Sequence, residues 1–258
     1  MINQDKNSDL TRLSIWGECQ EFIPERFRVE FNPDISFCIQ ERDFRNKLKS
    51  IGREDLWYTW KKYARPLIYS ERAKKYSSSD FLIQKKIEYD RRADDWHGFL
   101  ENLLLSEDVP VESKVVNVGS HDGEEVNGLN FDLTCIDISN ESLKRGKNKF
   151  RGMKFAYGTA DNLPLEDKSF DAYLSFRTWC VAGVLVDEAL DEALRILKSN
   201  GLIVVSFPLN FLGRKELIYA EDSKVKPVAG WAYNLLREKV GDLKTLFSPE
   251  DFLFYGKI

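Results

Sequence analysis

The alternation of hydrophobic and polar positions is most regular in the second half of the chain. Short apolar runs there have the length and β-branched character of buried strands, and helix-length amphipathic segments separate them. Two late runs, joined at Ser248-Pro249, predict a terminal hairpin. The predicted strands are 115–119, 131–138, 153–158, 169–176, 202–208, 242–247 and 250–258. This rhythm predicts a doubly wound, mostly parallel, seven-stranded Rossmann-like α/β sheet with an antiparallel C-terminal hairpin.

The first half has a different pattern. Apolar residues alternate on both sides of Asn32-Pro33-Asp34, which predicts a β-hairpin over 26–40. Residues 41–76 are charged and aromatic and predict helix, with an inward stripe formed by Leu56, Trp57, Trp60 and Tyr63. Ser77–Asp80 predicts a break and the N-cap of a helix over 81–105. We therefore expect an N-terminal α+β cap (1–80) and a main α/β domain (81–258).

Composition narrows the class of protein. The chain has 258 residues, a net charge of −4, four cysteines without a CxxC pair and two histidines. So few cysteines and histidines leave little for a metal site, and none is expected. The chain also has no apolar run of membrane length and no signal-like N-terminus, which together predict a cytoplasmic protein. Residues 41–92 carry 15 Lys and Arg against 8 Asp and Glu. This basic excess indicates either solvated helix faces or a surface for an anionic ligand or RNA.

The segment Lys114–Gly123, KVVNVGSHDG, is the first candidate binding element. An apolar strand runs there into a loop with glycines at 119 and 123, and glycine allows the backbone to approach a ligand closely. Asp137 lies at the end of the second predicted strand, where a carboxylate can accept hydrogen bonds from both hydroxyls of a ribose. Asp161 follows the third strand, where it can accept the exocyclic amine of a purine. Together these features indicate a nucleoside site.

The order of four phrases is specific to a known family. NVGSHDG, CIDIS, GTADNLPLEDKSFDAYLS and EALRILKSNGLIVVS resemble class I S-adenosylmethionine-dependent methyltransferases, most closely the small-molecule branch with ubiquinone-type methyltransferases. The resemblance covers about residues 89–258. It implies S-adenosylmethionine as cofactor and makes 81–258 the methyltransferase domain.

The resemblance also implies roles for individual residues. Gly119, Ser120 and Gly123 match the loop beside the methionine part of the cofactor, and Asp137 matches the ribose-binding acid. The other expected cofactor-binding residues cover the cofactor, lie on or beside the adenine, or end the fourth strand near the methyl group. These are Tyr89, Ile138, Asp161, Asn162 and Ser175, with Phe176 beside the last.

Two positions depart from the family pattern. Asn117, which we still count as cofactor-binding, stands where the family usually has an acid that helps to hold the ammonium group. His121 stands where the family has its middle glycine. Asn can accept a hydrogen bond but supplies no charge, so binding weaker by about 1–2 kcal/mol is expected unless another acid such as Asp122 compensates.

Three residues are candidates for the chemical step. His97 and His121 are candidate bases, with packed or loop-shaping histidines as the competing interpretation. Arg177, after the fourth strand, is a candidate clamp for an acidic substrate, or else an ion-pair partner of the acidic segment 187–192.

The resulting hypothesis is methyl transfer to O, N or C of a small molecule, with no membrane partner and no prediction of oligomeric state. An RNA methyltransferase that uses residues 41–92 is one alternative, disfavoured because the chain is acidic overall and has no recognisable RNA-binding module. A catalytically inactive cofactor-binding protein is another, motivated by Asn117 and His121. A nicotinamide dehydrogenase is disfavoured because the loop lacks the third glycine of GxGxxG.

Overall fold

A computed structural model describes residues 37–76, 96–180, 184–208, 226–247 and 251–258, and before them only 14, 17–21, 25, 28 and 30. Among the described residues, we find no helix with the length and apolar character required to span a membrane. The predicted helix over 81–105 is described only in part, since residues 96–106 are helical and the preceding segment lies outside the described residues.

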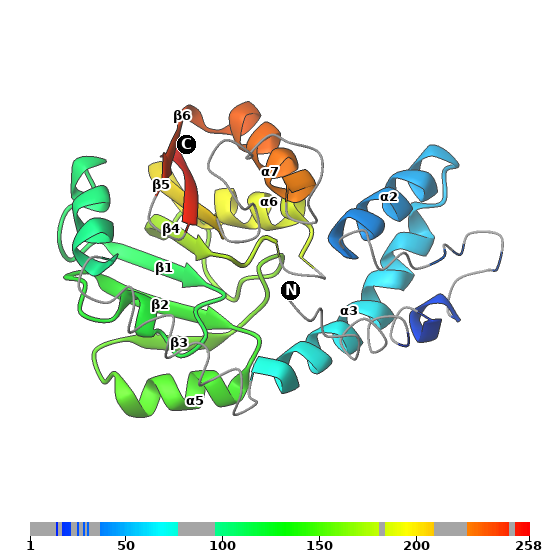
Figure 1. Ribbon diagram of the computed structural model, residues 1–258, viewed down its shortest axis with the longest axis horizontal. Helices are drawn as coiled ribbons and strands as arrows, with labels where there is room; N and C mark the ends of the chain where they lie inside the picture. Colours follow the sequence, from blue (N-terminus) through cyan, green and yellow to red (C-terminus); the bar gives the residue numbers. More distant parts are fainter. Residues whose placement is uncertain are drawn as a thin grey trace, which may run out of the picture.

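A seven-stranded sheet forms the main domain (Figure 1). Its order is β3-β2-β1-β4-β5-β7-β6, and β1 to β5 run parallel. The strands are β1 (Lys114–Val118), β2 (Asp132–Asp137), β3 (Lys154–Tyr157), β4 (Phe170–Phe176), β5 (Leu197–Pro208), β6 (Gly241–Phe247) and β7 (Asp251–Lys257). β7 lies between β5 and β6 and is antiparallel to both. The predicted Rossmann-like sheet with its terminal hairpin is therefore confirmed.

Alternating side chains of each strand pack on opposite faces of this sheet. Val116 and Val118 belong to one hydrophobic cluster, which includes α6 (Val186–Ile196) and α7 (Lys226–Lys239). Val115 belongs to a second cluster, which includes the helix 96–106 and Leu143 of α5 (Asn140–Lys149). Both faces are covered, which explains why the parallel strands are apolar nearly throughout.

A local signal sets the start of α5. The sequence predicts Ser139 as the N-cap of this helix, and its hydroxyl accepts a hydrogen bond from Ser142 N at 3.2 Å. In the sequence, Asn200-Gly201 after the amphipathic segment 184–198 predicts a helix C-cap, and this prediction is wrong. α6 stops at Ile196, and Asn200, with φ of 66°, lies within β5. Asn200 N donates instead to Ile258 O, so the main chain there pairs across the sheet.

The described part of the cap is helical. It consists of α2 (Phe37–Ser50) and α3 (Glu54–Tyr76), connected at Ile51–Arg53. Phe37 and Ile39 therefore lie in a helix, so the second strand of the predicted hairpin is wrong, and the rest of 26–40 falls mostly outside the described residues. Glu41, Phe44 and Leu48, all 1% exposed or less, follow at helical spacing. The helical period, rather than the alternation of apolar residues, therefore determines the structure of this segment.

Aromatic packing joins the two cap helices. Trp60 of α3 is fully buried, lies edge-on to Phe44 at 5.0 Å and donates to Glu41 Oε1 at 3.2 Å. Leu56 and Trp57 are also buried, as predicted, but Tyr63 is 40% exposed, so its place in the inward stripe is wrong.

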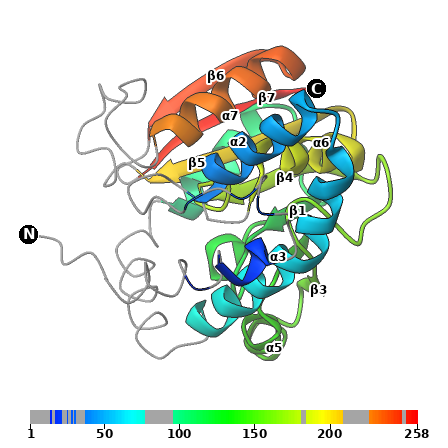
Figure 2. The same cartoon turned by 90° about the vertical axis from the view of Figure 1, so that its right-hand side faces the viewer.

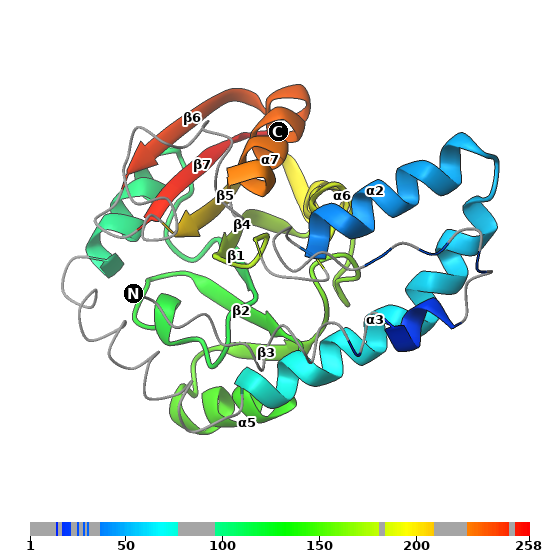
Figure 3. The same ribbon diagram turned by 45° about the vertical axis from the view of Figure 1, so that its right-hand side comes forward.

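The cap lies at the carboxyl ends of the parallel strands. The arrowheads of β1, β2 and β3 point to the side of the molecule where α2 and α3 lie (Figure 3). Seen from that side, α3 crosses in front of β3 and above α5 (Figure 2). α2 packs against α7, where the guanidinium of Arg42 lies 4.9 Å from the ring centre of Trp231. The cap is thus placed over the edge where this type of sheet binds ligands.

Candidate functional site

The strand order reverses between β1 and β4, which places the candidate site at their carboxyl ends. β2 and β3 lie on one side of β1, while β4 and β5 lie on the other. The loop 119–123, Asp137 and the turn after β3 therefore meet along one edge of the sheet. This edge brings together the main part of the predicted cofactor site.

Protein contacts account for both glycines of the loop 119–123. Gly119 has φ of 75°, and a Cβ there would lie 2.0 Å from Oγ1 of Thr178. That hydroxyl lies within hydrogen-bonding distance of the carbonyls of Val118 and Phe176, at 3.3 and 3.1 Å. Gly123 has φ of 85°, and a Cβ there would crowd Met153. The loop after β4 thus rests directly on the loop after β1.

Asp137 has the geometry of a hydroxyl acceptor. It is 6% exposed, and its Oδ1 and Oδ2 accept the main-chain N–H groups of Ser139 and His121, each at 2.8 Å. Burial raises the pKa of this carboxyl, and the two N–H donors oppose that shift. A carboxylate has about four acceptor positions, so two adjacent hydroxyls can still bind after two N–H groups. The residue therefore fits the ribose of a nucleoside.

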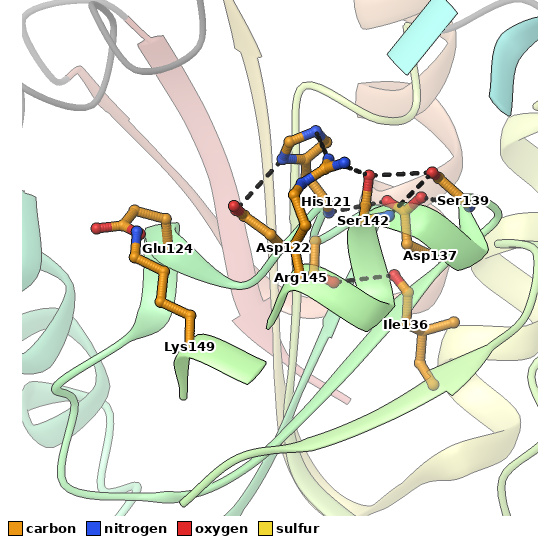
Figure 4. A network of polar contacts seen from close by, with 10 residues as sticks. His121, Asp122, Glu124, Ile136, Asp137, Ser139, Ser142, Arg145 and Lys149 are labelled. Atoms are coloured by element: carbon orange, nitrogen blue, oxygen red, sulfur yellow. Dashed lines mark hydrogen bonds and ion pairs between the residues drawn. The ribbon is translucent and has the colours of Figure 1, made fainter. Parts of the chain in front are cut away.

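His121 is held in a polar network rather than projecting alone (Figure 4). Its φ is 54°, Nδ1 lies 3.2 Å from Asp122 Oδ1, and Nε2 lies 3.3 Å from Nη2 of Arg145. A guanidinium only donates hydrogen bonds, so Nε2 of His121 is placed to accept from Arg145 while Nδ1 faces the Asp122 carboxylate. Burial raises the pKa of Asp122, but the hydrogen bond from His121 and nearby charges lower it overall. Arg145 also donates to Ser142 Oγ at 2.9 Å, which anchors the network on α5.

Asn117 is a buried polar residue at the centre of the site. It is 1% exposed, and neither its amide oxygen nor its amide nitrogen has a hydrogen-bond partner among the described residues. It pairs in register with Cys135 and Leu174, whose face is covered by the helix 96–106. Buried amides are costly without partners, so this side chain fits a polar ligand group or water near the methionine end of the cofactor.

Asp161 lies in the turn after β3, where Thr159 and Asn162 form an isolated bridge. Its side chain is 7% exposed, and Oδ2 lies 3.9 Å from Nζ of Lys61 on α3. Asn162 is exposed, while Ile138 is half-buried directly after Asp137. These three residues line the part of the edge next to β2 and β3.

The segment after Asp161 is held by two residues of α6. Glu192 Oε2 accepts Leu163 N at 2.8 Å. Arg195 donates to the carbonyls of Leu163 and Leu165, at 3.0 and 2.8 Å, and to Glu192. The position of Asp161 therefore depends on contacts made some thirty residues later in the chain.

Replacing Arg195 with methionine tests this support. The change removes hydrogen bonds to two main-chain carbonyls, so we expect the free energy of unfolding to fall by about 1–3 kcal/mol. Urea unfolding measures this loss. Arg237→Met, at an exposed position of α7, is the control and should change stability by less than about 0.5 kcal/mol. Equal stability of the two variants would contradict the proposed support.

The three catalytic candidates have structural contacts. Nε2 of His97 lies 3.2 Å from Glu124 O, so its N–H binds the main chain of the turn η2 (Glu124–Val126). His121 is in the network described above. Arg177, with φ of 54°, does not pair with residues 187–192 among the described contacts. Its Nε donates instead to the fully buried Asp251 of β7 at 2.5 Å, because β7 begins beside the end of β5.

Other predicted positions are placed as follows. Ser175 is fully buried and donates to Val118 O at 3.0 Å, and Ser120 Oγ donates to Ile136 O at 3.3 Å. Tyr89 lies outside the described residues. Cys135 and Cys180 are most simply read from the sequence as buried small apolar residues; Cys135 is buried, and burial raises its pKa to about 12. Cys180, however, is half-buried.

Sequence reasoning missed three residues that shape this edge: Lys61, Arg145 and Asp251. Arg145 could have been found, because Ser139, Ser142 and Arg145 follow at helical spacing beside the loop.

The described residues contain no group of three or more His, Cys, Asp or Glu arranged to hold a metal ion. A surface hollow of about 530 Å³, lined by residues 111–112 and 129–132, lies at the opposite edge of the sheet.

Comparison with known proteins agrees with this geometry. Residues 116–205 match the family described as "Methyltransferase domain". The chain is 29% identical over 165 residues to the ubiquinone/menaquinone biosynthesis C-methyltransferase UbiE of Rickettsia bellii, covering 58% of this chain and 62% of that protein. The corresponding Rickettsia typhi protein is 28% identical over 171 residues, with 60% and 64% covered. The chain thus spans less than two thirds of the length of these relatives.

A solved structure supports the fold. The putative methyltransferase of Haloferax volcanii, in complex with the Trm112 methyltransferase activator, has a TM-score of 0.50 and is 17% identical, with 67% of this chain and 93% of that chain covered. S-adenosylmethionine is the cofactor that the matching family uses. Residues 116–205 are thus similar to a methyltransferase domain, and these matches support the resemblance of the chain to class I S-adenosylmethionine-dependent methyltransferases.

Proposed function

We propose that this protein transfers the methyl group of S-adenosylmethionine to a small molecule that binds beneath the cap. The observation that carries the proposal is Asp137, a buried carboxylate held by two main-chain N–H groups at the end of β2. Such a carboxylate is oriented for a ribose diol before the cofactor arrives. Asn117 supports the same assignment, because its buried amide lacks a hydrogen-bond partner among the described residues.

Each residue at this edge of the sheet is assigned to one part of the cofactor. We assign Asp137 to the ribose hydroxyls, Ile138 to the face of the adenine, and Asp161 with Asn162 to its edge. Gly119 and Ser120, together with Gly123, form the loop beside the methionine part. We assign Asn117 to the methionine ammonium, where it offers an acceptor without a countercharge.

The sulfonium of the bound cofactor supplies an activated methyl group with a good leaving group. The protein's part is to align the acceptor and to exclude water. Trp96 and Phe176 contribute an apolar wall near the end of β4, with ring centres 5.1 Å apart and nearly perpendicular planes. Both rings are buried, so they can shield the transfer from solvent.

The histidine contacts favour an acceptor that needs little help from a protein base. His97 binds the carbonyl of Glu124, and His121 lies between Asp122 and Arg145. A neutral amine or an activated aromatic carbon can attack without a strong base, whereas a simple hydroxyl needs one. The names of the Rickettsia relatives specify C-methylation, which supports carbon as the first acceptor atom to test.

The basic cap gives less support to an RNA acceptor. Arg45 and Lys61 belong to the basic stretch 41–92, yet both pair with acidic residues at the start of α6. Part of the positive charge is therefore neutralised within the chain. A tRNA pool at physiological salt tests this alternative, because RNA contacts of this kind should be electrostatic.

Calorimetry with S-adenosylmethionine and S-adenosylhomocysteine tests the proposal. We expect both to bind, and we expect release of S-adenosylhomocysteine when a panel of quinols, phenols and amines is added. Absence of binding of both compounds at millimolar concentration would contradict the cofactor assignment. Binding without turnover on any acceptor, including tRNA, would favour the inactive cofactor-binding protein.

A further inference from the structure

A lysine of the cap reaches the adenine side of the candidate cofactor site. Nζ of Lys61, on α3, lies 2.7 Å from Glu188 Oε2 and 3.9 Å from Asp161 Oδ2. α3 belongs to the part of the chain that precedes the family match, and Asp161 lies within that match. The contact therefore joins the cap to a residue that we assign to cofactor binding.

A second cation of the cap also pairs with the start of α6. Arg45 of α2 pairs with Asp187 and lies 3.8 Å from Glu188. Arg45 thus joins the cap to the start of α6, while Lys61 joins it both to α6 and to Asp161. The two residues form a natural pair for comparison, because they share Glu188 and differ at Asp161.

Burial makes the charge of Lys61 matter for Asp161. The Asp161 side chain is 7% exposed, against 30% for Lys61. An almost buried carboxylate loses hydration, and a nearby cation stabilises its ionised form. The separation of 3.9 Å is a charge contact rather than a hydrogen bond, so Lys61 acts on Asp161 without the direct hydrogen bond that it makes with Glu188.

The ionised form of Asp161 determines which base it accepts. An ionised carboxylate can only accept hydrogen bonds, so it favours a base edge with an amino group and repels one with a carbonyl oxygen. Adenine presents an amino group at C6, whereas hypoxanthine presents a carbonyl there. The charge state and position of Asp161 therefore distinguish these two bases.

We propose that Lys61 is a positioning residue that the cap supplies to the cofactor site, where its charge stabilises the Asp161 carboxylate and orients it for the 6-amino group. Through Lys61, docking of the cap and binding of the adenine end favour each other. This inference rests on the proposed function, because it assumes that the adenine lies against Asp161.

Calorimetry with two ligands tests the role of Lys61. S-adenosylhomocysteine carries the amino group, and S-inosylhomocysteine replaces it with a carbonyl. In Lys61→Met we expect the affinity for S-adenosylhomocysteine to fall about tenfold, in the range of typical couplings between sites. The affinity for S-inosylhomocysteine should change little, so the preference for adenine is lost. Lys61→Arg keeps the charge and should retain most of the preference.

Arg45→Met is the matched control, because it removes a contact between the cap and α6 without touching Asp161. We expect it to lower the affinities for both ligands by the same factor or to leave both unchanged. If Lys61→Met also lowers both affinities equally, or changes neither, the positioning role is wrong. If the unaltered protein binds neither ligand, the proposed function itself fails, and that result does not depend on the variants.

Discussion

Replacing Asp137 with alanine is expected to abolish measurable binding of S-adenosylmethionine. The change removes both acceptors for the ribose hydroxyls, and charge-assisted hydrogen bonds of this kind contribute about 1.5–3 kcal/mol each. Affinity should therefore fall by at least about 100-fold. Titration calorimetry against the unaltered protein measures this loss.

The control for this change comes from the same strand. Asp132 lies at the amino end of β2, where it pairs with Lys154 on the surface. Asp132→Ala should bind the cofactor as the unaltered protein does. Because Asp137 also holds His121 N and Ser139 N, thermal unfolding of Asp137→Ala must be compared as well. A folded Asp137→Ala protein with unchanged affinity would show that the ribose lies elsewhere.

Replacing Gly119 with alanine is expected to destabilise the fold strongly, although it adds only one methyl group. The new Cβ would lie 2.0 Å from Oγ1 and 2.7 Å from Cγ2 of Thr178, at a main chain with φ of 75°. The left-handed conformation and the overpacking together should lower the free energy of unfolding by about 3–5 kcal/mol. Urea unfolding monitored by tryptophan fluorescence measures the change.

The variant Gly128→Ala separates the conformational cost from the cost of the clash. The φ of Gly128 is 88°, but a Cβ there would meet nothing within 4 Å, so Gly128→Ala reports the conformational cost alone, about 1–2 kcal/mol. In a Thr178→Gly background, Gly119→Ala should cost only this smaller amount, because the three crowding atoms are gone. A cost unchanged by Thr178→Gly would show that the clash does not limit Gly119.

Local sequence signals predicted the elements that depend on neighbouring residues. Ser139 caps α5 because Ser142 is three residues away, and the continuous apolar run 252–255 matches a strand covered on both faces. The hairpin prediction over 26–40 failed because short alternating runs can belong to either structure. The buried positions Glu41, Phe44 and Leu48 show that the helical period continues beyond such a run.

Site residues were predicted where the family pattern places acids at the ends of strands. Site residues were missed where segments distant in the sequence come into contact. Asp137 and Asp161 follow strands, so their position on one edge could be expected from the topology. Lys61 lies 127 residues from Glu188, and Arg177 lies 74 residues from Asp251. Such pairings depend on how the cap docks and on where β7 enters the sheet, and neither has a local signal.

The position of β7 also has a consequence for biosynthesis. β6 has β7 as its neighbour and makes no ladder with β5, although β6 is made first. As the chain leaves the ribosome, β6 must wait without a partner until residues 251–257 have emerged and paired with β5. The ion pair between Arg177 and Asp251 also needs this segment and cannot form before it has emerged. This edge of the sheet is therefore completed only after the strands that carry Asp137 and precede Asp161 have been made.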